Sequence, residues 1–298
     1  MREILRKILM GFMIIGFLFG LSILVYPLFA NVWNNYRDEQ LFQAYLHLSE
    51  QENGEETVDY SQLWQDAWDY NDDLQPLILP DSFIAAQKPY TKDEAYTNCL
   101  NLTGDGIMGY VYVPKITIRV PIYHSTDTEV LEKGIGHLHG SSLPVGGTDS
   151  HCVLAAHRGL PQSSLFTDLD QLVVGDQFYL YVLDEILAYE IDQILIVEPQ
   201  DTEALQVVQG QDLVTLLTCT PYGVNSHRLL VRGHRVPYVA EQMEAQKREY
   251  VPSANTNYIM WVCLGLAMTA EFLVFAVVLT KYIRKRRRRR KKRKNEKH

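Results

Sequence analysis

The sequence predicts a mainly β fold, a barrel or a sandwich, within a chain of 298 residues. From Gly109 to Val236, short apolar runs alternate with Gly, Pro, Asp and Ser, which is the pattern of strands and turns. Helical patterns are few there, and many short strands in so short a stretch indicate a closed or two-layered sheet. The expected strands are Gly109–Val113, Val120–Tyr123, Cys152–Ala156, Gln177–Val182, Ala188–Val197, Leu213–Thr218 and Leu229–Val236.

Three short helices are expected between these strands, at Asp127–Lys133, Ser164–Leu169 and Asp201–Leu205. The remaining composition divides the chain into regions of different character. They are a cytoplasmic start with an apolar segment (1–32), a helical extension (33–75), a loop (76–107), the β domain (108–240), a linker (241–256), a second apolar segment (257–280) and a basic tail (281–298).

The first apolar segment, Ile8–Ala30, has 23 residues and no charge, which is enough to cross a bilayer. A cleaved signal peptide is the alternative, but its apolar region is normally shorter, and Leu28 stands where a cleavage site prefers a small residue. We therefore favour an uncleaved anchor. In either case the basic residues before the segment stay in the cytoplasm and the β domain is exported.

The helical extension carries spaced apolar residues that suit two amphipathic helices divided near Asn53-Gly54. We interpret them as a packing stripe against the following domain. They are Tyr36, Leu41, Tyr45, Leu48, Leu63, Trp64 and Trp68.

The second apolar segment, 257–280, is also long enough to span, although Glu271 lies near its middle, where a carboxylate is costly. Residues 281–297 hold 13 of the 28 Lys and Arg, so residues 1–280 carry 15 basic and 35 acidic side chains, a net charge of −20. A basic cluster beside an apolar helix stays cytoplasmic. Nucleic-acid binding is the other interpretation of such a run, and the export signal argues against it.

The four cysteines are Cys99, Cys152, Cys219 and Cys263. They include no C-x-x-C pair, so the sequence suggests neither a zinc site nor a redox dithiol, although a Cys99–Cys152 bridge stays open. His137-Leu138-His139 has no carboxylate or cysteine at a matching spacing, so no metal and no cofactor are expected.

Residues 213–232 combine a thiol and a guanidinium around one loop. An apolar run ends on Cys219, a turn rich in Pro, Gly, Asn and Ser follows, and a second apolar run opens on Arg228. His157 stands at the end of another strand, at the entry to a Gly/Pro loop. A thiolate attacks carbonyls, a histidine moves the proton, and an arginine stabilises the oxyanion, so these three residues suit acyl transfer.

Other assignments of these residues stay open at this stage. Cys219 could be a buried inert thiol, which is common for free cysteine. Arg232 and Arg235 compete for the arginine role, but Arg228 lies nearest to the loop. The other candidate histidines are His124, His137, His139, His151, His227 and His234.

The string Thr215-Leu216-Leu217-Thr218-Cys219 resembles the TLxTC signature of sortases, the cysteine transpeptidases of Gram-positive surfaces, and its continuation through Gly233 resembles the class C, pilin-polymerising branch. The resemblance also includes Gly136–Leu138, Ser142–Gly147 and His157–Pro161. It implies a closed eight-stranded barrel with short helices. It further implies that Cys219 is the nucleophile, His157 the acid/base and Arg228 the oxyanion or substrate-positioning cation.

Class C sortases commonly carry a lid in which an Asp-Pro-aromatic element covers the cysteine. Here Asp81 and Phe83 match that element, and Ser82 stands in place of the proline. Because serine has a freer backbone, the lid is expected to be more mobile than the family pattern, or held differently.

The resemblance implies a membrane-bound transpeptidase that cleaves an LPxTG-type sorting signal on a pilin subunit and transfers it to a lysine of the next pilin. The partners would be pilins and membrane lipid, with no nucleic acid. The alternatives are a housekeeping sortase that anchors proteins to the cell wall, a cysteine protease with water as acceptor, and a non-catalytic binding module.

Overall fold

The computed structural model describes residues 2–49, 59–74, 83, 93–102, 104–160, 163–253, 261–271, 273, 275, 277–278, 280–282 and 285–286. The chain divides into two compact units. One, here called the barrel unit, is Tyr26–Ser253, and the other combines residues 1–25 with 254–298.

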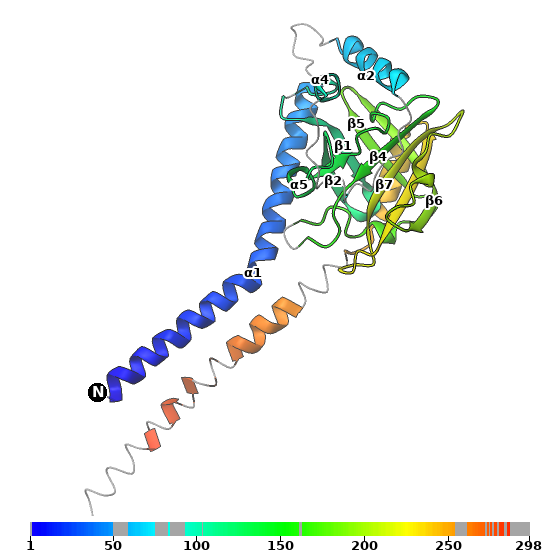
Figure 1. Cartoon of the computed structure of the whole chain (residues 1–298). Coiled ribbons are helices and arrows are strands. Elements are labelled where there is room, and N and C mark those ends of the chain that lie inside the picture. Colours follow the sequence, from blue (N-terminus) through cyan, green and yellow to red (C-terminus); the bar gives the residue numbers. More distant parts are fainter. Residues whose placement is uncertain are drawn as a thin grey trace, which may run out of the picture. The chain divides into compact units, whose positions relative to one another are not determined.

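Eight strands form a closed barrel in the order β1-β2-β3-β4-β7-β8-β6-β5 (Figure 1). The strands are β1 (Ile107–Val113), β2 (Ile118–Tyr123), β3 (Ile135–His137), β4 (Ser150–Ala155), β5 (Gln177–Val182), β6 (Glu185–Val197), β7 (Asp212–Thr220) and β8 (His227–Val236). All pairs are antiparallel except β2 with β3 and β4 with β7. The predicted mainly β fold is confirmed, and closure leaves the strands of the barrel without an open edge.

The expected strands are present, most of them longer than predicted, and β3 is an addition. Its three residues are too few to show a period of two in the sequence. The helix expected at Ser164–Leu169 is wrong, because this segment forms turns followed by the 3-10 turn η2 (Leu169–Gln171). The side chain of Arg158 binds the carbonyl of Thr167 there, which holds the segment in a loop. The other two expected helices appear as α5 (Thr128–Leu131) and η3 (Glu203–Leu205), and a further 3-10 turn, η1, covers Pro114–Ile116.

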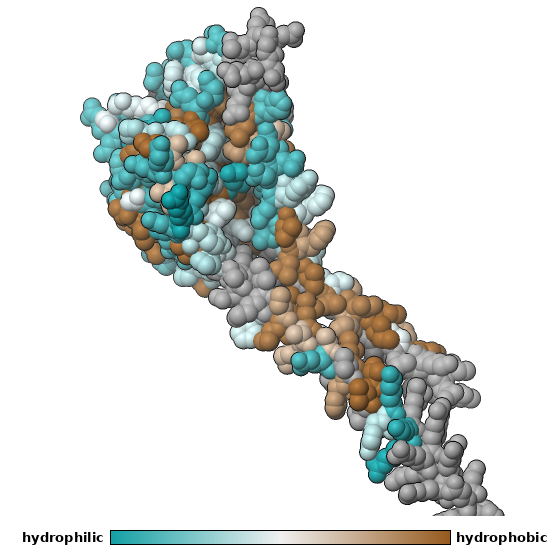
Figure 2. All heavy atoms as spheres, turned by 180° about the vertical axis from the view of Figure 1, so that it is seen from behind, coloured by the Kyte–Doolittle hydropathy of each residue, from teal (hydrophilic) through white to brown (hydrophobic). Residues whose placement is uncertain are grey.

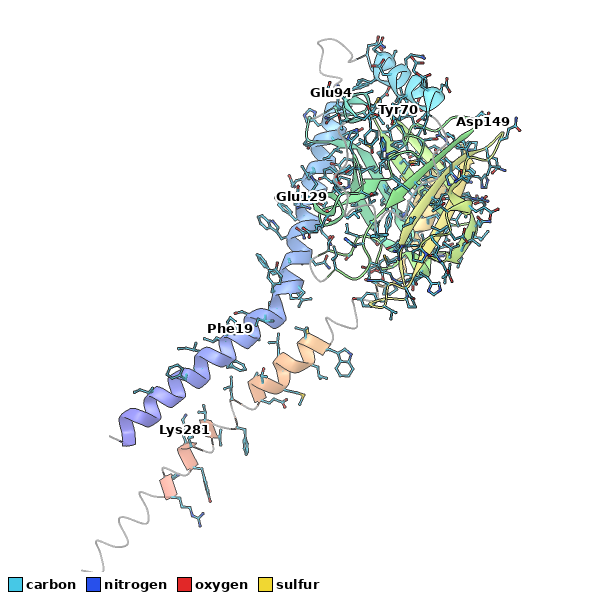
Figure 3. All side chains as sticks on the ribbon, viewed as in Figure 1. Phe19, Tyr70, Glu94, Glu129, Asp149 and Lys281 are labelled. Carbon is cyan, nitrogen blue, oxygen red and sulfur yellow. The ribbon has the colours of Figure 1, made fainter. Side chains whose placement is uncertain are left out.

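Helix α1 (Arg2–Ser49) runs without a break through the first apolar segment and into the extension. It is long and apolar enough to cross a membrane by length and composition. Large side chains such as Phe12 and Phe19 are 72% and 68% exposed, and Figure 3 shows Phe19 projecting from the helix. This part of α1 is mostly brown, and therefore apolar, in Figure 2.

The second half of α1 packs on the barrel through aromatic side chains. Phe42 and Tyr45 both lie edge-on to Tyr110 of β1, and the Tyr45 hydroxyl accepts a 2.7 Å hydrogen bond from the backbone N–H of Leu183. The guanidinium of Arg119 lies over the Phe42 ring. This half of α1 is therefore part of the barrel unit.

Helix α2 (Ser61–Asp73) follows, and its Trp64 is buried and donates to the Asp184 carboxylate at 2.9 Å. The expected packing stripe is confirmed for Tyr45 and Trp64, whereas Tyr36 and Trp68 are 59% and 43% exposed. The short helix α4 (Glu94–Asn98) precedes β1 and is capped by the side chain of Asp93.

Two segments after the barrel are helical. Helix α6 (Ala240–Arg248) lies in the expected linker and buries none of its residues. In the second apolar segment, Trp261–Glu271 forms an apolar helix. A membrane span over 257–280 remains a prediction, because part of that range lies outside the described residues. None of the four cysteines forms a disulfide bond, so no Cys99–Cys152 bridge is present.

The buried His137 makes folding sensitive to acid. Its Nδ1 lies 2.8 Å from the Tyr96 hydroxyl and its Nε2 lies 2.9 Å from the Ser142 carbonyl, an arrangement that suits a neutral ring. Burial lowers the pKa of His137 from 6.5 to about 3. Since the pKa of His137 is lower in the folded than in the unfolded chain, burial of the neutral ring stabilises the fold. This stabilisation is fully present above pH 6.5 and is lost as the pH falls toward 3.

We expect the free energy of unfolding of a fragment spanning the barrel unit to drop by about 2 kcal/mol between pH 7 and pH 5 through His137 alone. Denaturant titrations at the two pH values measure it. His137→Gln is the control, because its side chain does not titrate. An equal pH dependence in both proteins would contradict the assignment.

Candidate active site

The candidate site is built on β7 and its two neighbours, β4 and β8. In the antiparallel pair β7–β8, Cys219 lies directly opposite Arg228. Residues so placed on one face have Cβ atoms about 4.5–5.5 Å apart. The side chains of Cys219 and Arg228 therefore start side by side from the two strands.

His157 comes from the other neighbour. Strands β4 and β7 run parallel with Ala155 opposite Leu217, and the ladder continues with the N–H of Ala156 donating to the Leu217 carbonyl. Two residues further along each strand, His157 stands level with Cys219 and on the same face, since side chains alternate with a period of two. His157, Cys219 and Arg228 thus form a row across three adjacent chain segments. Neighbouring strands lie about 4.8 Å apart.

The β7–β8 loop holds the side chain of Arg228 at one end of this row. One guanidinium nitrogen donates to the carbonyls of Asn225 and His227, each at 3.1 Å, and only 7% of the residue is exposed. The loop turns tightly, with the N–H groups of Val224 and Asn225 both donating to the Pro221 carbonyl. Asn225 has a φ of 59°, which asparagine tolerates better than most residues.

The competing arginines have carboxylate partners elsewhere. Arg232 makes a two-pronged contact with Asp192 at 3.0 and 2.9 Å. Arg235 lies 3.9 Å from Asp212. Their positions on β8 favour Arg228 as the cation beside the thiol.

His157 is half-buried, and its surroundings act on its charge in opposite directions. Burial lowers the pKa of His157, while the nearby Glu132 carboxylate raises it by a smaller amount. The neutral imidazole is therefore favoured in the resting site, as a general base requires. Cys219 is 7% exposed, so it is reached by solvent only at its edge.

Phe83 lies against both partners of the thiol. Its ring centroid is 5.5 Å from that of His157, and the Arg228 guanidinium carbon lies 5.1 Å from the Phe83 centroid. The ring also packs on an apolar cluster that includes Ala155, Leu217 and other residues of this face. Asp81 and Ser82, the other expected lid residues, lie outside the described residues, and the lid remains a proposal.

If Phe83 restricts access to Cys219, Phe83→Ala is expected to increase the rate of thiol labelling at Cys219 several-fold. The Phe83 ring packs against His157 and Arg228 on either side of Cys219, so its removal opens a path for the reagent. Labelling rates are read by intact-mass spectrometry. Phe12→Ala, on the exposed apolar part of α1, is the control, and equal rates in the two variants would exclude this role.

The two threonines of the Thr215–Cys219 string tie β7 to β4, which the sequence did not reveal. The Thr215 hydroxyl lies 2.7 Å from Nε2 of His151, and the Thr218 hydroxyl donates to the Ala156 carbonyl at 2.8 Å. These bonds hold the two strands in the register on which the row depends.

Arg158 is a second element that sequence reasoning missed. Its guanidinium donates to Thr220 at the end of β7 and to the carbonyl of Thr167, and it pairs with Asp170. Gly159 follows with a φ of 81°, and a Cβ there would lie 2.9 Å from the Tyr222 ring. The loop after His157 is thus clamped to the loop after Cys219.

A cavity of about 550 Å³ lies at the opposite end of β4, and none of the three residues of the row lines it. Its lining includes Trp68 and Asn71 of α2, Asp149 and His151. His137 and His139, considered above for a metal, have other partners. His137 contacts Tyr96 and Ser142, and His139 lies 4.0 Å from Asp93.

Comparison with known proteins places this site in a family. A sortase domain model matches residues 111–236, which contain the whole row. The crystal structure of sortase C-1 from Actinomyces oris is 45% identical with a TM-score of 0.58, and the match covers 60% of this chain and 98% of that one. The chain belongs to the class C sortases.

Two further structures place this class C sortase among similar proteins. Sortase C from Streptococcus pneumoniae is 42% identical with a TM-score of 0.61, covering 67% of this chain and 98% of that chain. The pilus-related sortase C of Group B Streptococcus is 39% identical with a TM-score of 0.58, covering 66% and 97%. Among curated relatives, sortase D of Bacillus subtilis is 32% identical over 131 residues, and this chain spans 63% of its length.

Proposed function

We propose that this class C sortase is a membrane-anchored cysteine transpeptidase that joins pilin subunits through isopeptide bonds. The observation that carries the proposal is the row His157–Cys219–Arg228, with Phe83 packed against it. The similar structures include a pilus-related sortase C and a sortase C whose description concerns pilin substrate specificity.

In the first half of the reaction, the sulfur of Cys219 attacks the threonine carbonyl of an LPxTG-type sorting signal. His157 accepts the thiol proton and then gives it to the leaving amine as the peptide bond breaks. Arg228 carries a permanent positive charge beside the sulfur and stabilises the oxyanion that forms. The product is a thioester between the pilin threonine and Cys219.

In the second half, a lysine amine of another pilin attacks the thioester carbonyl. His157 takes a proton from this amine, the carbon–sulfur bond breaks, and the proton returns to the Cys219 sulfur. The new bond is an isopeptide bond.

For the location, we propose that the N-terminal segment anchors the chain and that the barrel unit lies outside the cell. The apolar part of α1 and the basic residues before it support this orientation. The 257–280 segment would span the membrane again and leave the basic tail in the cytoplasm.

A polymerisation assay tests the proposal. The full chain is incubated with a purified pilin that carries a sorting signal, and SDS-resistant ladders are sought, with Cys219→Ala as the control. A ladder that depends on Cys219 supports pilin joining. Transfer only to a small peptidoglycan-like amine would favour the housekeeping alternative, and release of the cleaved pilin alone would favour a protease. Unchanged function in Cys219→Ala would favour a binding module.

A further inference from the structure

The end of the barrel that bears the active site is tied to both flanks that lead into the apolar segments. On the N-terminal side, Asn31 of α1 hydrogen-bonds to the side chain of Ser164, in the loop that follows His157. On the C-terminal side, the N–H of Val251 donates to the Lys115 carbonyl, in the turn between β1 and β2, at 2.9 Å. All these residues belong to the barrel unit.

Strand directions show that these contacts share one end of the barrel. Strands β4, β7, β6 and β1 all end there, since β4 and β7 are parallel and the connected pairs β7–β8–β6–β5–β1 are antiparallel. The loops at this end include those after His157 and Cys219, and in Figure 1 they lie at the end from which α1 leaves the barrel.

The attachment points leave little room between this end and a bilayer. Asn31 is the residue after Ala30, where the first apolar segment ends. Val251 precedes the second apolar segment, at Asn257, by six residues, and six residues reach at most about 20 Å. If both segments are in the membrane, this end of the barrel faces the lipid surface.

The exposed apolar side chains are distributed in the same way. Among the described residues 59–253, the large apolar side chains that are 52–69% exposed belong to segments at this end, and those that are 37–43% exposed lie elsewhere. The first group is Val173, Val174, Ile196, Tyr222, Val224 and Tyr250. The second is Trp68, Val207, Val208, Tyr238 and Val239.

The part of α1 that belongs to the barrel unit carries a further band of exposed aromatic and apolar residues around Asn31. Trp33 and Tyr36 are each 59% exposed and their rings lie 6.4 Å apart, and Phe29 is 68% exposed. Trp and Tyr are enriched at membrane–water interfaces, where a ring meets the headgroups. The band places the interface at the level of the loop after His157.

We propose that the tip of the β7–β8 loop, Pro221–Val224, contacts the lipid interface, so that the active site opens onto the membrane surface. Tyr222 and Val224 would enter the headgroup region beside Trp33 and Tyr36. Residues 1–280 carry a net charge of −20, so the contact is apolar rather than electrostatic and does not weaken in salt. The inference rests on the membrane attachment of both flanks, and not on the transpeptidase chemistry.

Depth measurements on the full chain in phosphatidylcholine vesicles test it. Val224→Cys and Val207→Cys, the latter near the opposite end of the barrel, each receive a bimane label in a background with Cys99→Ser, Cys219→Ala and Cys263→Ser. Headgroup-nitroxide lipid is the quencher. We expect roughly twofold or greater quenching at position 224 relative to 207, because interfacial segments lie about 5–10 Å into the headgroup boundary. Equal quenching, or a difference that salt removes, would overturn the proposal.

Carbonate extraction distinguishes a failure of the proposed membrane anchoring from a failure of the proposed loop contact. A chain that carbonate releases from the vesicles is not anchored, which overturns both the anchoring and this inference. A chain that stays in the membrane with equal quenching at the two labels overturns this inference alone. Neither readout depends on catalysis, because the labelled chains lack the thiol of Cys219.

An activity comparison supplies an independent measurement. Val224→Asp places a charge in the proposed contact, and Val207→Asp is the matched control. We expect Val224→Asp to lower the rate on a sorting-signal peptide anchored in the same vesicles several-fold more than it lowers the rate on the soluble peptide. Equal factors for the two peptides would contradict the proposal.

Discussion

Replacement of Cys219 by alanine is expected to abolish thioester formation and isopeptide transfer. The loss follows from the proposed covalent step, because neither His157 nor Arg228 can accept an acyl group in place of the sulfur. Losses of a nucleophile in comparable enzymes reach about 10⁴–10⁶ in kcat, so we expect a reduction of at least about 10³-fold. Single-turnover mass spectrometry of the acyl-enzyme, with a sorting-signal peptide, measures the step directly.

Cys99 offers a matched control for this experiment. Cys99 is a half-buried thiol whose pKa is raised, chiefly by burial, and it lies outside the row. Cys99→Ala is therefore expected to retain activity close to that of the natural chain. Activity of Cys219→Ala comparable with that of Cys99→Ala would remove Cys219 from the reaction and favour the inert-thiol interpretation.

Replacement of Arg228 by alanine is expected to lower kcat by about 10²–10³-fold, the typical cost of losing an oxyanion donor. The substitution also removes the contacts of the guanidinium with the loop carbonyls of Asn225 and His227 and with the Phe83 ring. Arg228→Lys keeps the charge but not the planar fork of donors, so it should restore only part of the rate.

Arg232→Ala is the control for Arg228→Ala, since Arg232 lies four residues further along β8 and on the same face. It breaks a partly exposed ion pair with Asp192, so we expect a stability loss within about 1 kcal/mol and little change in kcat. Steady-state kinetics and thermal unfolding of both variants separate the two roles. A larger loss of kcat in Arg232→Ala than in Arg228→Ala would contradict the assignment.

Local pattern was sufficient to predict part of this site. A strand, a turn rich in Pro and Gly and a second strand place Cys219 and Arg228 on facing strands, because such a loop closes a hairpin. His157 lies 62 residues before Cys219, and the sequence alone cannot pair β4 with β7. The resemblance to sortases assigned His157 and Cys219 to one site, and the parallel register of β4 and β7 gives the physical basis for their proximity.

The features that sequence reasoning missed depend on contacts between distant segments. The bonds of Thr215 and Thr218 to β4 require the strand register, and the clamp formed by Arg158 requires the conformation of two loops. β3 pairs with both β2 and β4 although it has only three residues, so tertiary pairing rather than local propensity determines it. The incorrect helix at Ser164–Leu169 has the same cause.

The register of the three strands has a consequence for design. The same face carries Ala155, Leu217 and Leu230 one rung further along the strands, two residues before His157 and Cys219 and two residues after Arg228, in an equivalent backbone arrangement. Placing His, Cys and Arg at those three positions would reproduce the backbone geometry within an apolar cluster, without the loops that hold Arg228 and admit solvent. A template search that uses Cβ positions alone would score both rungs alike, so identification of such sites needs the strand termini as well as the spacing.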